Sequence, residues 1–579
     1  MQTLIDFSDP QAAGSDSTAL HCAFANPSRI LTAHSLDQIR PLLTTVQTLA
    51  EQGHWCVGYV RYEAAPAFDT ALAVHAPDGP LAWFAVYDAP LPLPTATAST
   101  STSVQWRSSL ARSVFDKNIE HIHQAIANGE LYQVNYTAPL LGQFQGDAPA
   151  LFAALHQAQP HGYSAFIDTG DKQILSVSPE LFFDWQPSSG HILTRPMKGT
   201  APRGANAKED AQLAEHLQTS AKERAENVMV VDLIRNDLSR IALPFSVQTP
   251  RLFHVQTLPT VLQMSSDVQA TTRPGTTLAD VFTALFPCGS ITGAPKVQAM
   301  RMIKELEPQA RGVYCGAIGV VRPGGHATFN VAIRTLTLRG AVARCGIGSG
   351  ITADASSDGE WQEWHHKRAF LERASAPFEL LETLGLHDGQ LPHAGAHLDR
   401  MARAAAHFFY PFDRSLLEQR LQALAQQHPT SSWRVRLCLG SQGQVQAQAY
   451  PLEATPTPVR LQLATSAFEW ADSEFARFKT THRAHYDAFV PRESGVFDTL
   501  LYNRHGEITE CTRGNIALRL NGRWVTPPLR CGLLAGVGRG RYLREEKMTE
   551  QVVHVHDLPQ VQELAFINSL RGWLGAILL

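Results

Sequence analysis

The sequence lacks the features of a secreted, membrane-spanning or nucleic-acid-binding protein. Its eight cysteines form no Cys-x-x-Cys pair and no regular spacing, which excludes a zinc ribbon and a disulfide framework. No stretch approaches the ~18 apolar residues of a membrane span, and the start of the chain does not resemble a signal peptide. A formal charge of −4 offers no basic field for a polyanion. We therefore predict a cytoplasmic protein with reduced thiols and with neither nucleic-acid nor membrane partners.

The length of the chain exceeds what one hydrophobic core can organise. Its 579 residues, 44% of them apolar, suit two to four globular domains, and no internal repeat is visible. A stretch rich in Pro, Ser and Thr at about 90–105 predicts a flexible loop. Alternating helix and strand patterns continue to about Leu371, and a new pattern begins at Phe378. We predict a first domain over residues 1–372 and a second over 373–579.

Two predicted helices, over residues 222–238 and 357–370, each place acidic side chains on one face. The residues concerned are Glu223 and Glu226 on the first helix, and Glu360 and Glu363, followed by Lys367, on the second. If the two acidic faces converge, oxygen ligation in an incomplete shell suits Mg²⁺, which takes its remaining ligands from water and an anionic substrate. Either helix alone would more often be a solvated charged surface.

Two segments rich in small residues, 286–296 and 345–354, fit the binding of a carboxylate. Their glycines let backbone N–H groups and the hydroxyls of Ser290 and Thr292 approach an anion, and the first segment opens a helix at Lys296. Neither segment is a dinucleotide fingerprint or a P-loop. Taken singly, such glycine-rich turns are usually only turns.

Six segments occur in the order and spacing of the chorismate-binding enzyme family, which residues 1–372 closely resemble. They are Ser178–Phe182, Pro196–Thr200, Ala225–Asp237, Gly289–Lys296, Arg311–Gly316 and Gly346–Gly350. The resemblance implies an α+β fold in which two large antiparallel sheets, flanked by helices, form a sandwich. It implies Glu226 and Glu363 as Mg²⁺ ligands with Glu223 and Glu360 behind them. It also implies that Tyr314, Arg334, Gly348 and Lys367 hold the two carboxylates of chorismate.

Lys198, inside the Pro196–Thr200 segment, separates the branches of this family. Members that add water to chorismate carry a lysine near Gln133, which this chain lacks, and anthranilate synthases have a small residue where Lys198 stands. The resemblance therefore implies amination at C4. By this resemblance, Lys198 is expected to attack C2 as the C4 hydroxyl leaves; ammonia would then attack C4 and expel the lysine, giving 4-amino-4-deoxychorismate. Gln263 occupies a position where many relatives have His, and an amide cannot supply a proton at neutral pH.

The chain contains no recognisable Cys/His/Glu set for hydrolysing glutamine. We therefore expect the ammonia to come from a separate glutamine amidotransferase subunit, or from free ammonia at high concentration.

Residues 378–579 resemble the fold-type IV pyridoxal-phosphate enzymes, which have a mixed α/β structure. The segments that carry the resemblance are Phe378–Thr383, His397–Arg400, Phe478–Arg483, Gly506–Ile516 and Gly532–Arg539. This cofactor requires an amine, a carboxylate beside the pyridine nitrogen and a phosphate cup. The resemblance gives these roles to Lys479, to Glu510, and to Arg400 with Val537 and Gly538 at the start of a helix.

A transaminase and a lyase are both compatible with this second half. Fusion to a chorismate-aminating domain, and the segment Asn568–Gly572, favour a lyase that releases pyruvate and forms the folate precursor 4-aminobenzoate. Two alternatives stay open. One is an anthranilate synthase component I fused to a class IV aminotransferase, and the other is a chain in which one half is inactive and regulatory.

Overall fold

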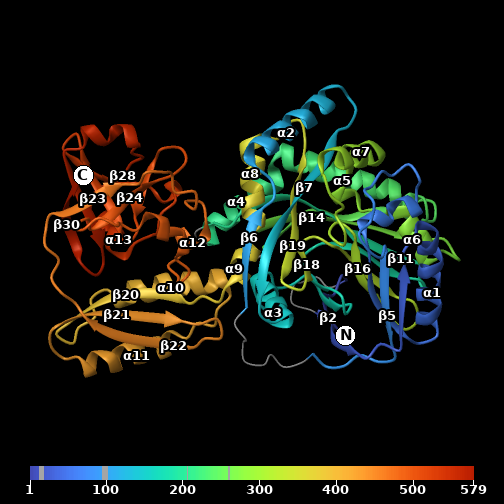
Figure 1. Cartoon of the computed structure of the whole chain (residues 1–579), viewed down its shortest axis with the longest axis horizontal. Helices are drawn as coiled ribbons and strands as arrows, with labels where there is room; N and C mark the ends of the chain where they lie inside the picture. The colour runs from blue at the N-terminus through green and yellow to red at the C-terminus, as the bar shows by residue number, and fades with distance from the viewer. Residues whose placement is uncertain (12–17, 94–101, 205–206, 258–260) are drawn as a thin grey trace. The chain divides into compact units, whose positions relative to one another are not determined.

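The computed structural model describes residues 1–11, 18–93, 102–204, 207–257 and 261–579 (Figure 1). The chain divides into two compact units, Met1–Pro377 and Phe378–Leu579. Residues 94–101 of the predicted flexible loop lie outside the described residues. The two ends of the predicted loop belong to ordered structure. Leu91 exchanges backbone hydrogen bonds with Ala23, and a strand begins at Ser103.

The first unit contains two large antiparallel sheets. Within the described residues, one sheet has the order β15-β7-β19-β18-β9-β8-β1-β2 with β6 paired to β7. Its strands are β1 Gln2–Ser8, β2 Thr18–Ala25, β6 Ser103–Ser108, β7 Gln133–Gln145, β8 Tyr163–Asp168, β9 Gln173–Ser178, β15 Gly293–Ala294, β18 Thr335–Arg339 and β19 Val342–Ile351. The other has the order β12-β14-β11-β10-β17-β16-β4-β5-β3 with β13 paired to β14. Its strands are β3 Arg29–Ala33, β4 Trp55–Val60, β5 Ala82–Tyr87, β10 Leu181–Gln186, β11 His191–Arg195, β12 Met197–Pro202, β13 Gln248–Thr257, β14 Val261–Thr271, β16 Ala317–Val321 and β17 Ala327–Val331.

Three hydrophobic clusters make this unit a sandwich with helices outside. The inner cluster joins Ile5 and Phe7 of one sheet to Tyr59 and Ile318 of the other. The outer face of the first sheet is covered by α2 Arg112–Ala127, α3 Ala148–Ala158, α7 Lys296–Leu306, α8 Ser357–Lys367 and α9 Ala369–Ser375. The outer face of the second is covered by α1 Ile39–Glu51, α5 Ala221–Ser239 and α6 Leu278–Leu285, while α4 Ala207–Thr219 contacts β12 to β14. The predicted sandwich of two antiparallel sheets flanked by helices is confirmed.

The second unit has a mixed α/β structure, also as predicted. A small antiparallel sheet, β20 Leu380–His387, β21 Ser432–Leu439 and β22 Val445–Pro451, packs against α10 Ala394–Phe408 and α11 Arg414–Gln427. A larger sheet has the order β25-β24-β23-β30-β29-β26-β27-β28 and pairs strands in both directions. Its strands are β23 Val459–Leu463, β24 Asp498–Tyr502, β25 Ile508–Cys511, β26 Asn515–Leu520, β27 Arg523–Thr526, β28 Thr549–Glu550, β29 Glu563–Asn568 and β30 Gly572–Leu578. The helices α12 Glu474–Arg477 and α13 Val537–Arg544 complete the unit.

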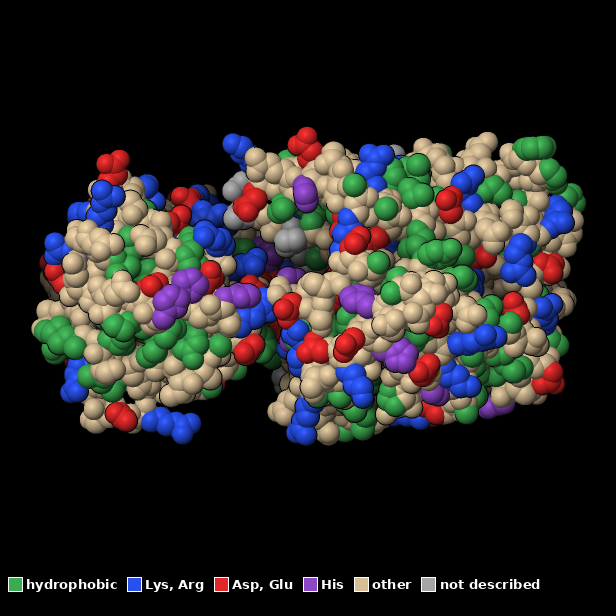
Figure 2. Space-filling model, turned by 90° about the horizontal axis from the view of Figure 1, so that it is seen from above, with side chains coloured by type: hydrophobic (Ala, Val, Ile, Leu, Met, Phe, Trp, Pro, Cys, Tyr) green, Lys and Arg blue, Asp and Glu red, His purple; other side chains and the backbone are tan. Residues whose placement is uncertain are grey.

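The surface and the thiols agree with the composition. On the face shown in Figure 2, acidic and basic side chains are interspersed and no large patch of one sign is seen. All eight cysteines are buried, and none forms a disulfide in the structure. Within the part of the chain that the structure describes, no helix has the length and apolar character needed to cross a membrane.

Candidate active sites

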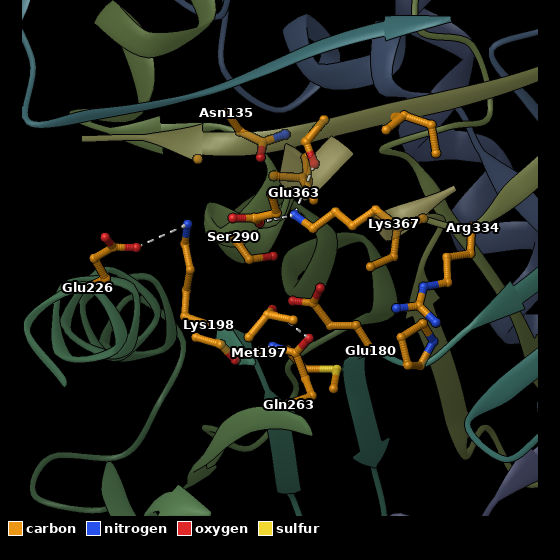
Figure 3. A pocket seen from close by; sticks show the side chains of 18 of the residues that line it. Asn135, Glu180, Met197, Lys198, Glu226, Gln263, Ser290, Arg334, Glu363 and Lys367 are labelled. Carbon is orange, nitrogen blue, oxygen red and sulfur yellow. Dashed lines mark hydrogen bonds and ion pairs between the residues drawn. The ribbon is translucent and has the colours of Figure 1, made fainter. Parts of the chain in front are cut away.

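A cavity of about 150 Å³ in the first unit gathers most of the residues predicted for its site (Figure 3). It lies among β12, β19, α5 and α8. The predicted residues that line it are Lys198, Glu223, Glu226, Ser290, Tyr314, Arg334, Gly348, Glu360, Glu363 and Lys367. Thr292 is not among them: its side chain is fully buried, and its hydroxyl donates to the carbonyl oxygens of Cys288 and Gly289 at 3.2 and 3.3 Å.

Lys198 extends from β12 into the cavity, and its nearest carboxylate oxygen, Oε2 of Glu226, is 3.9 Å from Nζ (Figure 3). Asn227 donates to the carbonyl of Lys198 at 3.3 Å and so ties this strand to α5. The Nζ atom also lies against Gly350 of β19, because a Cβ added to Gly350 would be only 2.2 Å from it. Two packed elements therefore fix where the amine can be.

The four predicted metal ligands reach the same cavity from two helices. Burial, and then the charges of Glu226 and Glu363, raise the pKa of Glu223, so these carboxylates are close enough to repel each other. Burial and the charge of Glu363 likewise raise the pKa of Glu360, whose Oε2 accepts a hydrogen bond from Ser349. Burial alone would raise the pKa of Glu363, but Lys367, 2.7 Å away, lowers it.

This arrangement fits an open Mg²⁺ site. Among the described residues, no group of three or more His, Cys, Asp or Glu side chains is placed so that it could hold a metal ion by itself. Mg²⁺ is usually bound through one or two protein carboxylates, with water and substrate oxygens in the other positions. The carboxylates on α5 and α8 meet that requirement, with Glu226 and Glu363 on either side of the Lys198 amine (Figure 3).

The opposite part of the cavity is suited to anions. Burial, and then the charge of Arg373, lower the pKa of Arg334 to about 10, so positive charge accumulates there. Arg334 has a left-handed backbone conformation, φ +49°, which is uncommon for a non-glycine residue and typical of functional positions. Lys367 donates to the carbonyl of Gly348 at 3.0 Å. Burial raises the pKa of Tyr314 well above its ordinary value, so its hydroxyl remains a hydrogen-bond donor.

Glu180, which was not assigned a role from the sequence, also lines the cavity (Figure 3). Burial raises the pKa of this carboxyl to about 7, although Ser290 and the backbone N–H of Met197 lower it. Its Oε1 atom has no hydrogen-bond partner within the described residues. The sequence did contain an indication of this role, since Glu180 lies inside the Ser178–Phe182 segment. Only the fold shows that this carboxyl is desolvated, because the apolar strands that surround it are distant in the sequence.

The two amides noted in the sequence have different surroundings. Gln263 donates to the carbonyl of Gly199 at 2.8 Å and accepts from the Thr200 hydroxyl at 3.1 Å. It therefore supports strand β12 next to Lys198. Gln133 is buried, and its side-chain nitrogen and oxygen have no hydrogen-bond partner in the described part of the chain. A Cβ on Gly350 would lie 2.5 Å from its Nε2 atom, so Gln133 faces the same point as Lys198.

The second unit contains a cavity of about 270 Å³ that brings together Arg400, Lys479, Glu510 and Val537. Burial, followed by the charges of Arg483 and Arg400, lowers the pKa of Lys479 to about 7. Such an amine is substantially neutral at physiological pH and can act as a nucleophile.

Glu510 is held by groups that sequence reasoning did not identify. Its Oε1 accepts from the Tyr486 hydroxyl at 2.8 Å, and its Oε2 accepts from the backbone N–H of Leu534 at 3.1 Å. Burial raises the pKa of Glu510 to about 7, and the hydrogen bond from Tyr486 opposes that rise. A carboxyl of this kind fits the position beside a pyridine nitrogen, where a protonated ring would stabilise its charge.

Arg400 is positioned by a buried ion pair. Its guanidinium donates twice to Glu382, at 2.8 and 2.6 Å, and His397 lies 2.6 Å from the same carboxylate. Burial would raise the pKa of Glu382, but Arg400 and His397 lower it to about 2. Arg400 also reaches the carbonyl of Ala535 at 3.2 Å, next to the start of α13.

The start of α13 fits a phosphate cup. Gly536 is its N-cap residue and Val537 its first residue, and both line the cavity. Gly538 does not line it; a Cβ there would lie 2.8 Å from the backbone carbon of Asn568, so glycine permits the close packing of α13. Unpaired N–H groups at a helix start favour an anion. The cavity residues therefore fit pyridoxal phosphate.

Three further arginines line this cavity: Arg434, Arg513 and Arg571. Burial, and then the charges of Arg513 and Arg434, lower the pKa of Arg571, so the three guanidinium groups repel one another. Arg571 lies in the Asn568–Gly572 segment. The sequence indicated this segment as a feature of a lyase but did not show which of its residues lines the site. Together these arginines favour a substrate with more than one negative charge.

Comparisons with known proteins match this division of the chain. Residues 6–373 match the sequence model of the chorismate binding enzyme family, and residues 379–577 match that of the class IV amino-transferases. The chain belongs to the chorismate binding enzyme family, and its second unit carries a class IV aminotransferase domain, which implies pyridoxal phosphate as cofactor.

Curated relatives include two proteins named aminodeoxychorismate synthase component 1 and one named anthranilate synthase component 1. The chain is 41% identical over 262 residues to aminodeoxychorismate synthase component 1 of Salmonella typhimurium. The aligned region covers 45% of this chain and 57% of that protein. It is 41% identical over 291 residues to the same component of Klebsiella aerogenes, covering 50% and 63%. Anthranilate synthase component 1 of Aquifex aeolicus is 35% identical over 269 residues, covering 46% and 54%. The matches span less than two thirds of the length of these relatives.

A solved structure supports the fold of the first unit. Anthranilate synthase component I from Streptococcus pneumoniae superposes with a TM-score of 0.53 at 24% identity, covering 64% of this chain and 92% of that one. At that level of identity the likeness concerns the fold alone.

Proposed function

We propose that the chain makes 4-aminobenzoate in two steps. The first unit aminates chorismate to 4-amino-4-deoxychorismate, using ammonia from a separate glutamine amidotransferase subunit. The second unit removes pyruvate from that product. The component 1 relatives support the first step, and the class IV domain supports the second.

The observation that carries the first step is the placement of Lys198. Its amine extends into the cavity, where its one ion pair among the described residues is the 3.9 Å contact with Glu226 and it makes no hydrogen bond. Lys367, in contrast, is engaged by Glu363 and by the carbonyl of Gly348. Lys198 is therefore the buried amine that is available to form a bond to C2 of chorismate as the C4–O bond breaks. Ammonia then forms the C4–N bond, and the bond to Lys198 breaks.

Glu180 can supply the proton for the departing hydroxyl, which the amide of Gln263 cannot supply. A carboxyl with a pKa near 7 is partly protonated at physiological pH and can donate a proton to the departing hydroxyl, which leaves as water. Its unpartnered Oε1 atom and its place on the cavity wall agree with that role. We assign Glu180 as the general acid of the first step.

Glu226 and Glu363 are the proposed holders of Mg²⁺, supported by Glu223 and Glu360. The metal would neutralise a carboxylate of chorismate, and Arg334, Tyr314 and Lys367 would orient the other.

In the second unit, Lys479 is the proposed attachment and proton-transfer residue. Pyridoxal phosphate supplies an electron sink that stabilises a carbanion beside the substrate amine. Lys479 removes the proton from the carbon that bears the amine. The bond between the ring and the enolpyruvyl oxygen then breaks, the ring becomes aromatic, and the enolpyruvate that leaves takes up a proton to become pyruvate. Arg434, Arg513 and Arg571 favour this substrate, a dicarboxylate, over the single carboxylate of most amino acids.

The product of the pure protein tests the proposal. With chorismate, Mg²⁺, ammonium and pyridoxal phosphate, we expect 4-aminobenzoate and pyruvate in equal amounts. Anthranilate as the aromatic product would overturn the proposal. Glutamine in place of ammonium should give no product unless an amidotransferase subunit is added; product from glutamine and the chain alone would refute the proposed partner.

Substitution of Arg571 tests the lyase against the transaminase. In Arg571→Gln, we expect KM for 4-amino-4-deoxychorismate to rise roughly tenfold or more, since a charge-assisted contact is lost. Arg530→Gln, at an exposed position, is the matched control. Faster transamination of a monocarboxylic amino acid than pyruvate release by the unsubstituted chain would favour the aminotransferase alternative.

A further inference from the structure

The first unit holds a second, larger cavity of about 710 Å³ that the proposed reaction does not use. Its walls come from β7, β18, β19, the first turn of α2 and the segment that follows α7. Tyr314 and Gly346 line both this cavity and the chorismate cavity, so they form a shared wall.

One end of the second cavity carries buried positive charge. Arg61 is 3% exposed; its Nη2 bonds to Asp78 and its Nε lies 3.5 Å from Glu63, but Nε and Nη1 have no hydrogen-bond partner among the described residues. Lys172 is also 3% exposed. Its Nζ lies 5.1 Å from the centre of the Tyr59 ring, with no carboxylate in ion-pair distance in the described part of the chain.

Five cations line this cavity, Arg61, Lys172, Arg311, Arg339 and Arg344, against three carboxylates, Asp78, Glu305 and Glu307. Arg339 and Arg344 line the same cavity, and the Arg339 guanidinium donates to the backbone carbonyl of Asp78 at 3.4 Å. Burial and the charge of Arg61 lower the pKa of Lys172 to about 8, as expected where cations are in excess. Buried, incompletely paired cations are costly, and an anion would relieve that cost.

The rest of the cavity wall is apolar. Val114, Leu141 and Val342 line it and are 46%, 40% and 55% exposed, so their apolar surface is left uncovered. Cavities that combine such walls with a few convergent polar groups are typical of small-molecule sites. Because these residues line a cavity, a small anion suits this place better than a flat protein surface.

We propose that this cavity binds a small ring-containing carboxylate, with its carboxylate at Arg61 and Lys172 and its ring against Val114, Leu141 and Val342. The ligand acts as an effector of the chorismate site through Tyr314. The Tyr314 ring packs directly on Gly346, since a Cβ there would lie 2.2 Å from it. A ligand pressing on that ring therefore also acts on the opposite wall.

Binding of benzoate and of 4-aminobenzoate to the holoenzyme, measured by calorimetry, tests the site. Lys172→Gln should weaken binding roughly tenfold, the loss of one charge-assisted contact. Val342→Glu should weaken it through repulsion, while Val342→Lys, the matched control at the same exposed position, should not. Binding that is unchanged in both Lys172→Gln and Val342→Glu would overturn the proposal, as would no saturable binding at millimolar concentration.

Two further arms separate this cavity from the other two. Saturating chorismate should change the affinity for benzoate without abolishing it; simple competition would place benzoate in the chorismate cavity and refute the inference. Loss of binding only in Arg571→Gln would place it in the second unit, with the same consequence. A shift in KM for chorismate on adding benzoate tests the effector role, and the binding measurements stand even if the proposed amination is wrong.

Discussion

The cavities around Lys198 and Lys479 differ in the charges of their walls. Lys198 shares its cavity with four glutamates on α5 and α8 as well as with Arg334 and Lys367. Lys479 shares its cavity with five arginines, Arg400, Arg434, Arg483, Arg513 and Arg571, and with one carboxylate, Glu510. The same residue type therefore meets two electrostatic environments in one chain. Carboxylates suit a metal ion, while arginines suit a phosphate and a dicarboxylate and favour the neutral form of the Lys479 amine.

The comparison shows two ways in which a fold can make a lysine amine suitable for reaction. For Lys479, burial and neighbouring cations set the pKa near 7, so the chemical state of the amine is built into the fold. For Lys198, the structure shows positional control instead. Its strand is tied to α5 through Asn227, and its amine is confined between Glu226 and Gly350. Changes of charge should therefore affect Lys479 most, and changes of shape should affect Lys198.

Replacing Lys479 should give the largest effect. We expect Lys479→Ala to lower 4-aminobenzoate formation by roughly 10³-fold or more, because both attachment of the cofactor and proton transfer depend on this amine. The intermediate 4-amino-4-deoxychorismate should accumulate at the normal rate, which chromatography can follow. Lys547→Ala, at an exposed position, is the control. If 4-aminobenzoate formation persisted in Lys479→Ala, the assignment of the second unit would fail.

Replacing Lys198 should block the first unit and spare the second. We expect Lys198→Ala to reduce amination of chorismate by roughly 10²- to 10³-fold, because the covalent route is removed. Lyase activity on supplied 4-amino-4-deoxychorismate should be unchanged, and Mg²⁺ binding should be retained. Lys304→Ala on α7 serves as the exposed control. Full activity of Lys198→Ala, with no lysine adduct in mass spectra of the native protein, would reduce Lys198 to a substrate contact.

The sequence predicted elements and single reactive residues better than it predicted their partners. The paired glutamates on 222–238 and 357–370 share a cavity because helical spacing fixes which side chains lie on one face. Thr292 was misplaced because its neighbour Ser290 enters the cavity while the short turn at Gly289–Ile291 points Thr292 into the protein. Glu180 was missed because desolvation depends on strands distant in sequence.

The charge excess around Lys479 could not be predicted either. Arg434 comes from β21, Arg513 follows β25, and Arg571 precedes β30, so only the folded sheets bring them together. Local motifs contain no information on such convergence. The pairing of β7 with β19, which opposes Asn135 to Gly350, is also long-range, and it is what brings Gly350 to the amine of Lys198.

A single methyl group at Gly350 should test the positional control of Lys198. A Cβ there would lie 2.2 Å from Nζ of Lys198 and 2.5 Å from Nε2 of Gln133. Both atoms are at the ends of flexible side chains, so the fold should tolerate Gly350→Ala while the amine is displaced. We expect the amination rate to fall roughly tenfold, as small misplacements of reacting groups cost this much or more. Gly395→Ala, where a Cβ meets open space, is the matched control. An unchanged rate would show that Lys198 has no fixed position.

A charge change near Lys479 should give the smallest effect, a shift in pH dependence. Burial and then Arg483 lower the pKa of Lys479 to about 7, so the neutral amine of the apoprotein is populated as pH rises through about 7. The rate of cofactor attachment, followed by absorbance, should rise over that interval. Arg483→Gln removes one cation and should move the midpoint to higher pH by up to about one unit.

Because the depressed pKa means that the native state binds fewer protons than the unfolded state, stability of the apoprotein should also rise with pH above about 7, and less steeply in Arg483→Gln. A midpoint that does not move would show that Arg483 does not contribute to the lowered pKa of Lys479, and would leave burial and Arg400 as its causes.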